Sequence, residues 1–399
     1  THLGLSYNNA LKKLDLSNCT ILSNLYFREN NTITNLDLSY CNVLDSLTFY
    51  STLLTNLDVS NHNALFYFAC QDNDSLINLD LSNCNALSSL YISYNPSLIN
   101  LDLSNFTSLT TLECWYNTSL INLNLSNCTA LPIVYGFNSN SALTSLNLSN
   151  CSSVTEIRCN GLKSLTSLIV NNCLVLNTLD CSSTKLTSLD VSNNVELSDL
   201  NCSDSKLANL NLNGCTSLTV LNCNSNILST LNVLSLNALI YLNCSENSLT
   251  TLDLSKNSSL STIHCNDNLL ECLNVKNGNN ISVSGFETFN NYTLLCIDVD
   301  DSTYCTNKSV WKDGIDSWSR FSEDCGNSCS HSSINDNPFE QVITVYPNPN
   351  NGSFRVEVSF KKPSDISIFI INTLGEVVYS DFENDVSKQI FNIDLNLPD

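Results

Sequence analysis

Basic residues are scarce in this sequence. Sixteen lysines and arginines stand against 38 aspartates and glutamates, which gives a formal net charge of -22. Such a surface repels phosphate backbones and anionic lipid headgroups, so we expect no nucleic acid among its partners. The sequence also lacks any run of about 18 apolar residues, and we therefore expect no transmembrane span. Thr1 is not followed by the basic and apolar regions of a signal peptide, but export removes such a peptide and the compartment stays open.

What the sequence has in abundance is a repeat. A tetrad typified by LDLS recurs every 21 to 23 residues. It begins at Leu14, Leu36, Leu57, Leu79, Leu101, Leu123, Leu146, Leu168, Leu189, Leu210, Leu231, Leu252 and Leu273. Eleven residues after each of the first twelve comes a second apolar anchor, at Leu25, Leu47, Phe68, Leu90, Leu112, Val134, Ile157, Leu179, Leu200, Leu221, Leu242 and Ile263. Repetition at this period is the signature of a solenoid.

Each coil is expected to hold two short strands. Within NLDLS the leucines alternate with polar residues, the period of a strand with one buried face. About ten residues per half-coil leave no room for an ordinary helix, so we predict short parallel strands on both sides of the solenoid. We call the side that carries the tetrads the LDLS side, and the side that carries the second anchors the variable side.

The repeat unit, LxxLxCxxNxLxxLDLSxN, resembles bacterial leucine-rich repeats of the internalin-like kind, and the resemblance covers residues 11 to about 276. It implies a mainly β protein whose residues 1–276 form a leucine-rich-repeat solenoid of about 12 to 13 coils. Solenoids usually recognise partners on a broad face whose residues vary from coil to coil.

Most of the 20 cysteines fall into two columns of the repeat. One column lies two residues after the second anchor, facing inward: Cys70, Cys114, Cys159, Cys181, Cys202, Cys223, Cys244 and Cys265. The other lies five residues after the first anchor, where other coils have asparagine: Cys19, Cys41, Cys84, Cys128, Cys151, Cys173 and Cys215. Stacked cysteines point their Cβ bonds in parallel, which disfavours disulfides, and they form a line rather than the tetrahedron that zinc needs. We predict free, buried thiols that pack as small apolar groups.

The LDLS side is monotonous. The position after the first anchor is aspartate or asparagine in all coils but one, and serine follows two residues later in nine of the thirteen tetrads. Such ladders indicate scaffolding. Carboxylates about 4.8 Å apart could also collect calcium, although single carboxylates would hold it loosely.

The variable side carries outward aromatic residues, concentrated in the first six coils. They include Tyr26 and the candidate ligand-binding residues Tyr50, Tyr67, Tyr91, Tyr94, Trp115, Tyr116, Tyr135 and Phe137. Exposed aromatics gathered on a rigid sheet are typical of binding surfaces. The alternative is that stacked rings only stabilise neighbouring strands.

An enzyme is not indicated. The chain has four histidines in unrelated places, and only His264, with Asp267 and Glu246, could form an acid/base or metal cluster. A solvated surface explains these residues equally well, and no pocket is predicted around them. We predict no catalytic residues, no metal ligands and no cofactor other than weakly held calcium.

The period breaks after Val275, and residues 277–325 are expected to cap the solenoid. This segment resembles the capping region that follows such repeats in surface proteins of the Bacteroidetes type. The resemblance implies a disulfide between Cys296 and Cys325. It leaves the state of Cys272, Cys305 and Cys329 open.

Residues 326–341 form a polar linker, and residues 342–399 contain alternating strands broken by Pro-Asn-Pro and Asn-Gly turns, which suggests a small β-sandwich. The YPNP opening from Tyr346 to Gly352 and the NTLGEVVYS hairpin from Asn372 to Ser380 resemble the type IX secretion sorting domain. That domain normally continues beyond the point where this sequence ends, so we expect an incomplete copy. The resemblance implies export across the outer membrane, often with removal of the sorting domain and attachment of the remainder to the cell surface.

Together these features predict a secreted or cell-surface recognition protein, of adhesin or receptor type, that binds an extracellular protein or glycan through the aromatic part of its variable side. The alternative is a non-catalytic structural component of the envelope or matrix, for which the carboxylate ladder could bind calcium.

Overall fold

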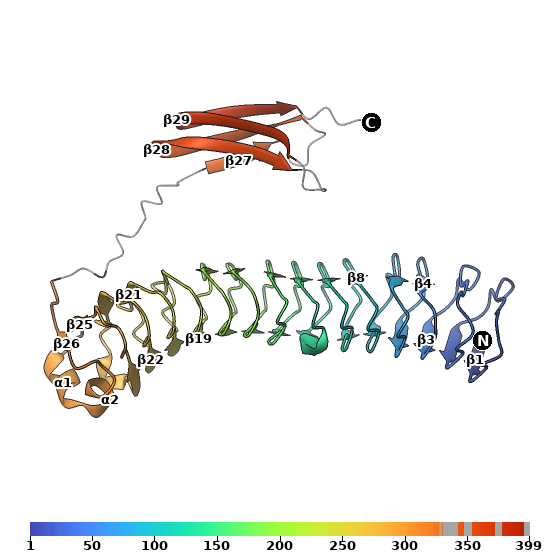
Figure 1. Cartoon of the computed structure of the whole chain (residues 1–399), viewed down its shortest axis with the longest axis horizontal. Helices are drawn as coiled ribbons and strands as arrows, with labels where there is room; N and C mark the ends of the chain where they lie inside the picture. Colours follow the sequence, from blue (N-terminus) through green and yellow to red (C-terminus); the bar gives the residue numbers. More distant parts are fainter. Residues whose placement is uncertain (327–328, 330–341, 347–352, 372–376, 395–399) are drawn as a thin grey trace. The chain divides into compact units, whose positions relative to one another are not determined.

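The chain divides into two units, Thr1–Cys329 and Ser330–Asp399. In a computed structural model, the described residues are 1–326, 329, 342–346, 353–371 and 377–394. Figure 1 shows the first unit as a single row of stacked coils. The anchors of the coils are part of one buried hydrophobic core. The row arches gently, with the LDLS side on its outer edge.

The variable side forms a nearly continuous parallel sheet. Its first part has the strands β1 (His2–Ser6), β2 (Asn24–Arg28), β3 (Ser46–Tyr50), β5 (Tyr67–Gln71), β7 (Ser89–Tyr91) and β9 (Thr111–Glu113). Its second part has β11 (Ile133–Val134), β13 (Glu156–Arg158), β15 (Thr178–Asp180), β17 (Asp199–Asn201), β19 (Val220–Asn222), β20 (Tyr241–Asn243), β22 (Thr262–His264) and β24 (Gly285–Glu287). Successive anchors are register partners, as Leu25 and Leu47 are. The leucine pattern therefore fixes the register.

The LDLS side is more broken than the repeat predicts. Its strands form four separate sheets: β4 (Asn56–Asp58) with β6 (Asn78–Asp80); β8 (Asn100–Asp102), β10 (Asn122–Asn124), β12 (Ser145–Asn147) and β14 (Ser167–Ile169); β16 (Ser188–Asp190) with β18 (Asn209–Asn211); and β21 (Thr251–Asp253), β23 (Cys272–Asn274), β25 (Cys296–Asp298) and β26 (Arg320–Ser322). The tetrads at Leu14, Leu36 and Leu231 form no strand. Coils on the outer edge of an arch lie farther apart, so hydrogen bonds between them are lost there first.

The monotonous columns of the LDLS side have a local function. Each aspartate accepts a hydrogen bond from the backbone N–H of the serine two residues later, as Asp58 Oδ1 does from Ser60 at 2.9 Å. Asn124 makes the same bond to Ser126 at 3.1 Å. Hydrogen bonds from Ser60 hold the pKa of Asp58 below its ordinary value. The side chains of this column therefore stabilise turns at the strand ends by accepting backbone hydrogen bonds, which aspartate and asparagine do equally well.

All fifteen cysteines of the two columns are free thiols, as predicted, and only Cys19 is partly exposed. Burial raises the pKa of Cys70 to about 12. In the second column the thiols also donate hydrogen bonds, since Cys84 Sγ lies 3.0 Å from the carbonyl oxygen of Val59 in the preceding coil. Asn257 Nδ2 makes the equivalent bond to Val233 at 2.8 Å. This shared bond explains why asparagine and cysteine alternate in that column.

The variable sheet breaks between β9 and β11. The coil here has 23 residues between LDLS tetrads, and the extra residue lets the chain form a 3-10 turn, η1 (Phe137–Ser139). Gly136 has φ of 83°, and its Cα faces the indole nitrogen of Trp115 so closely that a Cβ would overlap it. Phe137 is consequently buried, with 1% of its surface exposed, and our prediction that it faces outward is wrong.

Both sheets continue beyond residue 276, through β24, β25 and β26. This end of the unit also holds η2 (Asn280–Ser282), α1 (Ser302–Asn307) and α2 (Ser309–Lys312), and α1 contacts β26 while α2 contacts β24. The Trp311 ring is buried 4.3 Å from that of Phe286. Cys296 and Cys325, the pair implied by the resemblance, form a disulfide, and so do Cys272 and Cys329. Cys305 is a buried free thiol.

The second unit is an antiparallel sheet of β27 (Val342–Tyr346), β28 (Ser353–Ile371) and β29 (Val377–Asp394), in that order. Val356 and Phe391 are cross-strand partners and both are buried. Its described residues form this one sheet, so the expected sandwich is not confirmed. The YPNP turn after Tyr346 and residues 372–376 of the hairpin lie outside the described residues. Among the described residues, no helix is long and apolar enough to cross a membrane.

The cysteine columns predict a simple thiol count. Denatured, unreduced protein should release the fifteen column thiols and Cys305, whereas native protein should expose about one, Cys19, to a colorimetric thiol reagent. Fewer than about ten thiols after denaturation would show that column cysteines are oxidised, and the free-thiol structure would be wrong.

Burial of the thiols also predicts unfolding in alkali. Unfolded cysteines lose their protons near pH 8.5, whereas native ones, such as Cys70 with a pKa of about 12, keep them. The unfolded state is therefore favoured as pH rises above about 8.5, by about 1.4 kcal/mol per pH unit for each buried thiol. Urea midpoints followed by circular dichroism should fall steeply between pH 8 and 10. A constant midpoint over that range would contradict the raised pKa values.

Replacing Gly136 by alanine should destabilise the sixth coil more than replacing Gly161. Both glycines have positive φ, so each alanine costs about 1–2 kcal/mol of backbone strain. Only at Gly136 does the new methyl group meet the Trp115 indole, whereas a Cβ at Gly161 has no neighbour within 4 Å. Urea unfolding followed by tryptophan fluorescence should show the larger loss for Gly136→Ala. Equal losses would mean that the indole moves aside freely.

Candidate recognition surface

Two tyrosines of the variable side occupy positions whose backbone conformation is unfavourable for bulky side chains. The position four residues after each second anchor, which we call the turn column, has positive φ in coil after coil, with 59° at Tyr94 and 56° at Tyr116. A third tyrosine, Tyr7, occupies the equivalent position at the start of the solenoid, and most other coils have smaller or acidic residues there, such as Ser51, Asp72 and Gly161. Bulky side chains are rare in this conformation. Two tyrosines in adjacent coils are therefore an outlier that needs an explanation.

The turn column is held rigidly by the residue that follows it. Asn95 is fully buried, its Nδ2 donates to Cys70 O at 2.9 Å, and its backbone N–H donates to Asn117 Oδ1 at 3.0 Å. Tyr94 itself donates its backbone N–H to Trp115 O at 2.9 Å. The buried asparagines lock the turn, so the rings of Tyr94 and Tyr116 are presented on a fixed backbone.

The aromatic side chains pair along the coils. The Tyr94 and Tyr116 rings stack with centroids 4.6 Å apart and planes 10° apart, and each side chain remains 46% exposed. The Tyr67–Tyr91 and Tyr26–Tyr50 rings are tilted, at 5.5 and 6.3 Å. We call the set Tyr50, Tyr67, Tyr91, Tyr94, Trp115, Tyr116 and Tyr135 the aromatic surface.

The aromatic surface reaches the break in the variable sheet. Tyr135 is 51% exposed, whereas Tyr50, Tyr67, Tyr91 and Trp115 are half-buried. The Trp115 indole N–H is buried against Gly136 without a hydrogen-bond partner, so only part of this ring is available to a ligand. Burial raises the pKa of Tyr50 and Tyr67, which keeps both hydroxyls neutral.

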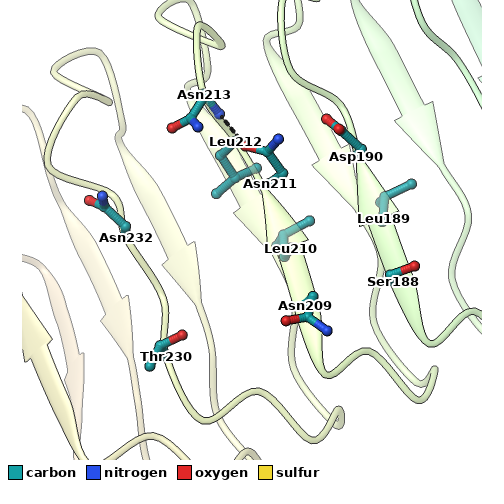
Figure 2. A pocket seen from close by; sticks show the side chains of 10 residues that line it. All are labelled: Ser188, Leu189, Asp190, Asn209, Leu210, Asn211, Leu212, Asn213, Thr230 and Asn232. Atoms are coloured by element: carbon teal, nitrogen blue, oxygen red, sulfur yellow. Dashed lines mark hydrogen bonds between the residues drawn. The ribbon is translucent and has the colours of Figure 1, made fainter. Parts of the chain in front are cut away.

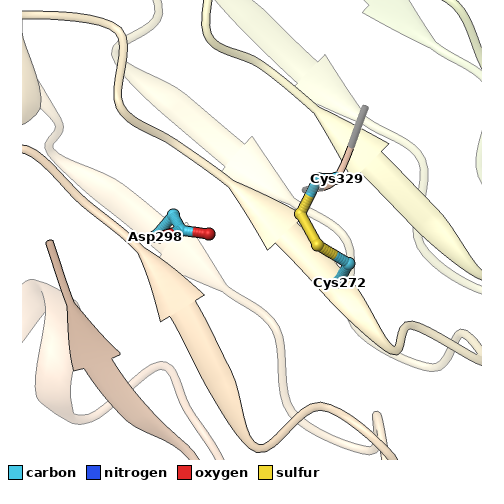
Figure 3. A group of neighbouring side chains, drawn as sticks. All are labelled: Cys272, Asp298 and Cys329. Atoms are coloured by element: carbon cyan, nitrogen blue, oxygen red, sulfur yellow. A yellow bond between two sulfur atoms is a disulfide. The ribbon is translucent and has the colours of Figure 1, made fainter. Parts of the chain in front are cut away.

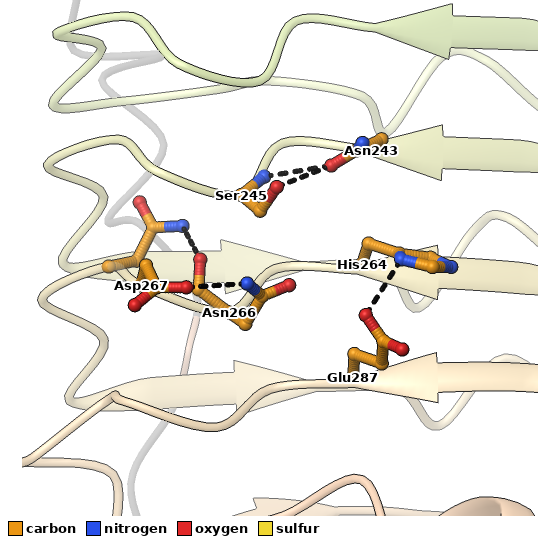
Figure 4. Close-up of polar contacts among 7 residues, drawn as sticks. Asn243, Ser245, His264, Asn266, Asp267 and Glu287 are labelled. Atoms are coloured by element: carbon orange, nitrogen blue, oxygen red, sulfur yellow. Dashed lines mark hydrogen bonds and ion pairs between the residues drawn. The ribbon is translucent and has the colours of Figure 1, made fainter.

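The polar residues at the other end of the variable side do not form one cluster. His264 Nδ1 lies 3.0 Å from Glu287 Oε2, a partner that the repeat pattern does not predict (Figure 4). Asp267 instead accepts from Asn266 and Asn290, at 2.6 and 2.7 Å. Glu246 accepts from Ser225 at 3.0 Å. Asp267 and Glu246 thus have neighbours other than His264, and the three residues build no joint acid/base centre.

A hollow of about 560 Å³ lies on the LDLS side, where β18 has no strand partner in the next coil. Figure 2 shows β16 and β18 on one flank and the Thr230–Asn232 segment on the other. Its lining repeats the scaffold columns, and Asn211 Oδ1 already accepts the backbone N–H of Asn213 at 3.2 Å. The hollow follows from the broken sheet and gathers no distinctive chemical groups.

Within the described part of the chain, one group of three side chains is close enough to share a metal ion: Cys272, Asp298 and Cys329. Figure 3 shows that the two sulfurs are joined to each other. Asp298 is 9% exposed and accepts the backbone N–H of Cys325 at 2.9 Å. The group therefore holds the end of the solenoid together through a disulfide.

Comparison with known proteins identifies most of the second unit and finds solved repeat proteins that align with much of the chain. Residues 344–397 match the model of the secretion system C-terminal sorting domain. No curated protein matches the chain. Among solved structures, a functional domain of InlJ from Listeria monocytogenes, which includes a cysteine ladder, aligns at 29% identity over 68% of this chain and 55% of that chain, with a TM-score of 0.38.

Two further structures align similarly. The internalin InlF from Listeria monocytogenes is 22% identical over 67% of this chain and 81% of its own, with a TM-score of 0.37. A leucine-rich repeat protein from Bacteroides eggerthii is 13% identical over 79% and 63%, with a TM-score of 0.34. Because these scores are low, the assignment rests on the chain's own repeat and on the sorting-domain match. The chain thus combines a leucine-rich-repeat solenoid with a secretion system C-terminal sorting domain, which directs it to the cell surface or out of the cell.

Proposed function

We propose that the protein recognises an extracellular macromolecule through the aromatic surface and carries out no catalysis itself. The observation that carries this proposal is the Tyr94–Tyr116 pair, stacked at 4.6 Å and 46% exposed at positions of positive φ. Strained, solvent-exposed aromatic residues on a rigid support are characteristic of binding sites. Export to the cell surface or beyond would give such a site access to partners outside the cell.

A purely structural role for the rings makes a different prediction. If stacking only stabilised adjacent coils, replacing the rings would lower stability. If the rings serve recognition, smaller residues in the turn column should leave stability unchanged or raise it, since they relieve the backbone strain. The chain itself supplies suitable replacements, because Ser183 and Ser225 occupy the turn column and Asn201 occupies the position equivalent to Tyr91.

The test is a screen of the full chain against arrays of extracellular proteins and glycans, beside a Tyr91→Asn, Tyr94→Ser, Tyr116→Ser variant. The variant should fold with an unchanged or higher melting temperature and lose at least about tenfold in affinity for ligands that the original protein binds. Trp115 is left in place because it packs on Gly136.

Ile99→Thr is the matched control. Ile99 is an exposed apolar side chain of the LDLS side, and Thr144 occupies the same column, so this change removes apolar surface away from the aromatic surface. Equal loss of binding in both variants would move the site elsewhere. Absence of any ligand would favour the alternative of a structural envelope component, in which calcium bound by the LDLS side could be tested by chelation.

A further inference from the structure

The aromatic surface lies in a part of the chain that has no basic side chain. No lysine or arginine occurs between Arg28 and Arg158, whereas ten aspartates and glutamates fall within residues 29–157. With zero basic and ten acidic residues, and histidine neutral, this stretch has a formal charge of -10. A cation near these tyrosines must therefore come from another part of the chain or from another molecule.

The first two coils show how this fold holds a cation beside the turn column. The guanidinium carbon of Arg28 lies 5.7 Å from the centroid of the Tyr7 ring, and Arg28 Nε lies 3.0 Å from Glu29 Oε1. Tyr7 and Glu29 are neighbours in the turn column, with φ of 61° and 50°. One guanidinium group thus makes a cation–π contact with a ring in one coil and an ion pair with a carboxylate in the next.

A carboxylate and a tyrosine are also neighbours beside the stacked tyrosines, in the reverse order along the chain. Asp72 and Tyr94 occupy the turn column in adjacent coils, with φ of 57° and 59°, and Tyr116 follows in the next coil. Asp72 is exposed, and its charge acts on Tyr50, while the charge of Glu113 acts on Tyr67. Asp72 therefore lies beside Tyr94 in the turn column, and Glu113 is the register partner of Tyr91. Among the described residues, no ion pair or cation–π contact occupies any of these groups.

We propose that the aromatic surface binds a basic segment of an extracellular protein, with lysine or arginine side chains placed over Tyr94 and Tyr116 and paired with Asp72 and Glu113. This inference rests on the proposed function and names its class of partner. A cation over an exposed ring raises affinity by about two- to fivefold per ring, and a nearby carboxylate adds to this. The net charge of -22 would also speed the approach of a basic partner.

The test uses the full chain and a hexa-arginine peptide, titrated by calorimetry in 0.15 M salt. Asp72→Asn should weaken binding about three- to tenfold, and the Tyr94→Ser, Tyr116→Ser variant about tenfold. Asp204→Asn is the matched control, because Asp204 occupies the turn column with φ of 51° between Ser183 and Ser225. It removes the same charge from the same backbone position without a neighbouring ring, and it should leave binding unchanged.

Equal weakening by Asp204→Asn and Asp72→Asn would reduce the effect to general charge attraction and overturn the proposal. Failure of the original protein to bind the peptide would also overturn it. The proposed function can survive that failure, because a glycan or neutral protein that binds the original chain and not the tyrosine variant would still locate recognition at the aromatic surface. If neither the peptide nor any array ligand depended on the tyrosines, both proposals would fall.

Discussion

The whole structure depends on coils that stack in register at the spacing of one β-strand. Leucine anchors from successive coils are direct partners, so every position of the repeat becomes a column that runs along the solenoid. A side chain's environment is then set by its column, and its neighbours are the same position one coil earlier and one coil later. Core, turn and surface are thereby separated throughout the first unit.

This constraint explains how one residue type serves two purposes. A cysteine in the first column replaces a core leucine or phenylalanine, and burial keeps its thiol protonated. In the second column the thiol donates to a carbonyl oxygen of the preceding coil, in place of an asparagine amide. Disulfides form only at Cys272, Cys296, Cys325 and Cys329, where the period ends and the chain can approach itself at other angles.

Surface chemistry follows the same logic. The LDLS side repeats one hydrogen-bonded turn from coil to coil, which leaves little that a partner could distinguish. The variable side changes along its length, from tyrosines in the first six coils to asparagine and serine in the later ones. Stacking of the coils brings chosen residues together, because the Tyr94 and Tyr116 rings of adjacent coils meet face to face and Asp72 occupies the same column one coil earlier. A small number of residues can therefore define an extended recognition surface.

The features that repeat could all be predicted from the spacing of residues along the chain. The period gave the solenoid, its two strands per coil and the two cysteine columns, because regular spacing fixes local backbone and burial together. Tertiary structure decided what the irregular residues do. Phe137 lies three residues after its anchor, like Tyr50, yet the extra residue of its coil and the turn at Gly136 direct it into the core.

Contacts between different columns could not be predicted from the sequence. The separate sheets of the LDLS side depend on the arch of the stack, and the His264–Glu287 pair depends on a strand that continues past the apparent end of the repeat. The ring stacking of Tyr94 and Tyr116 depends on φ values that no local pattern of tyrosines would indicate. Periodicity specifies which residues become neighbours, but the direction of each side chain is set by the curvature, turns and packing of the folded stack.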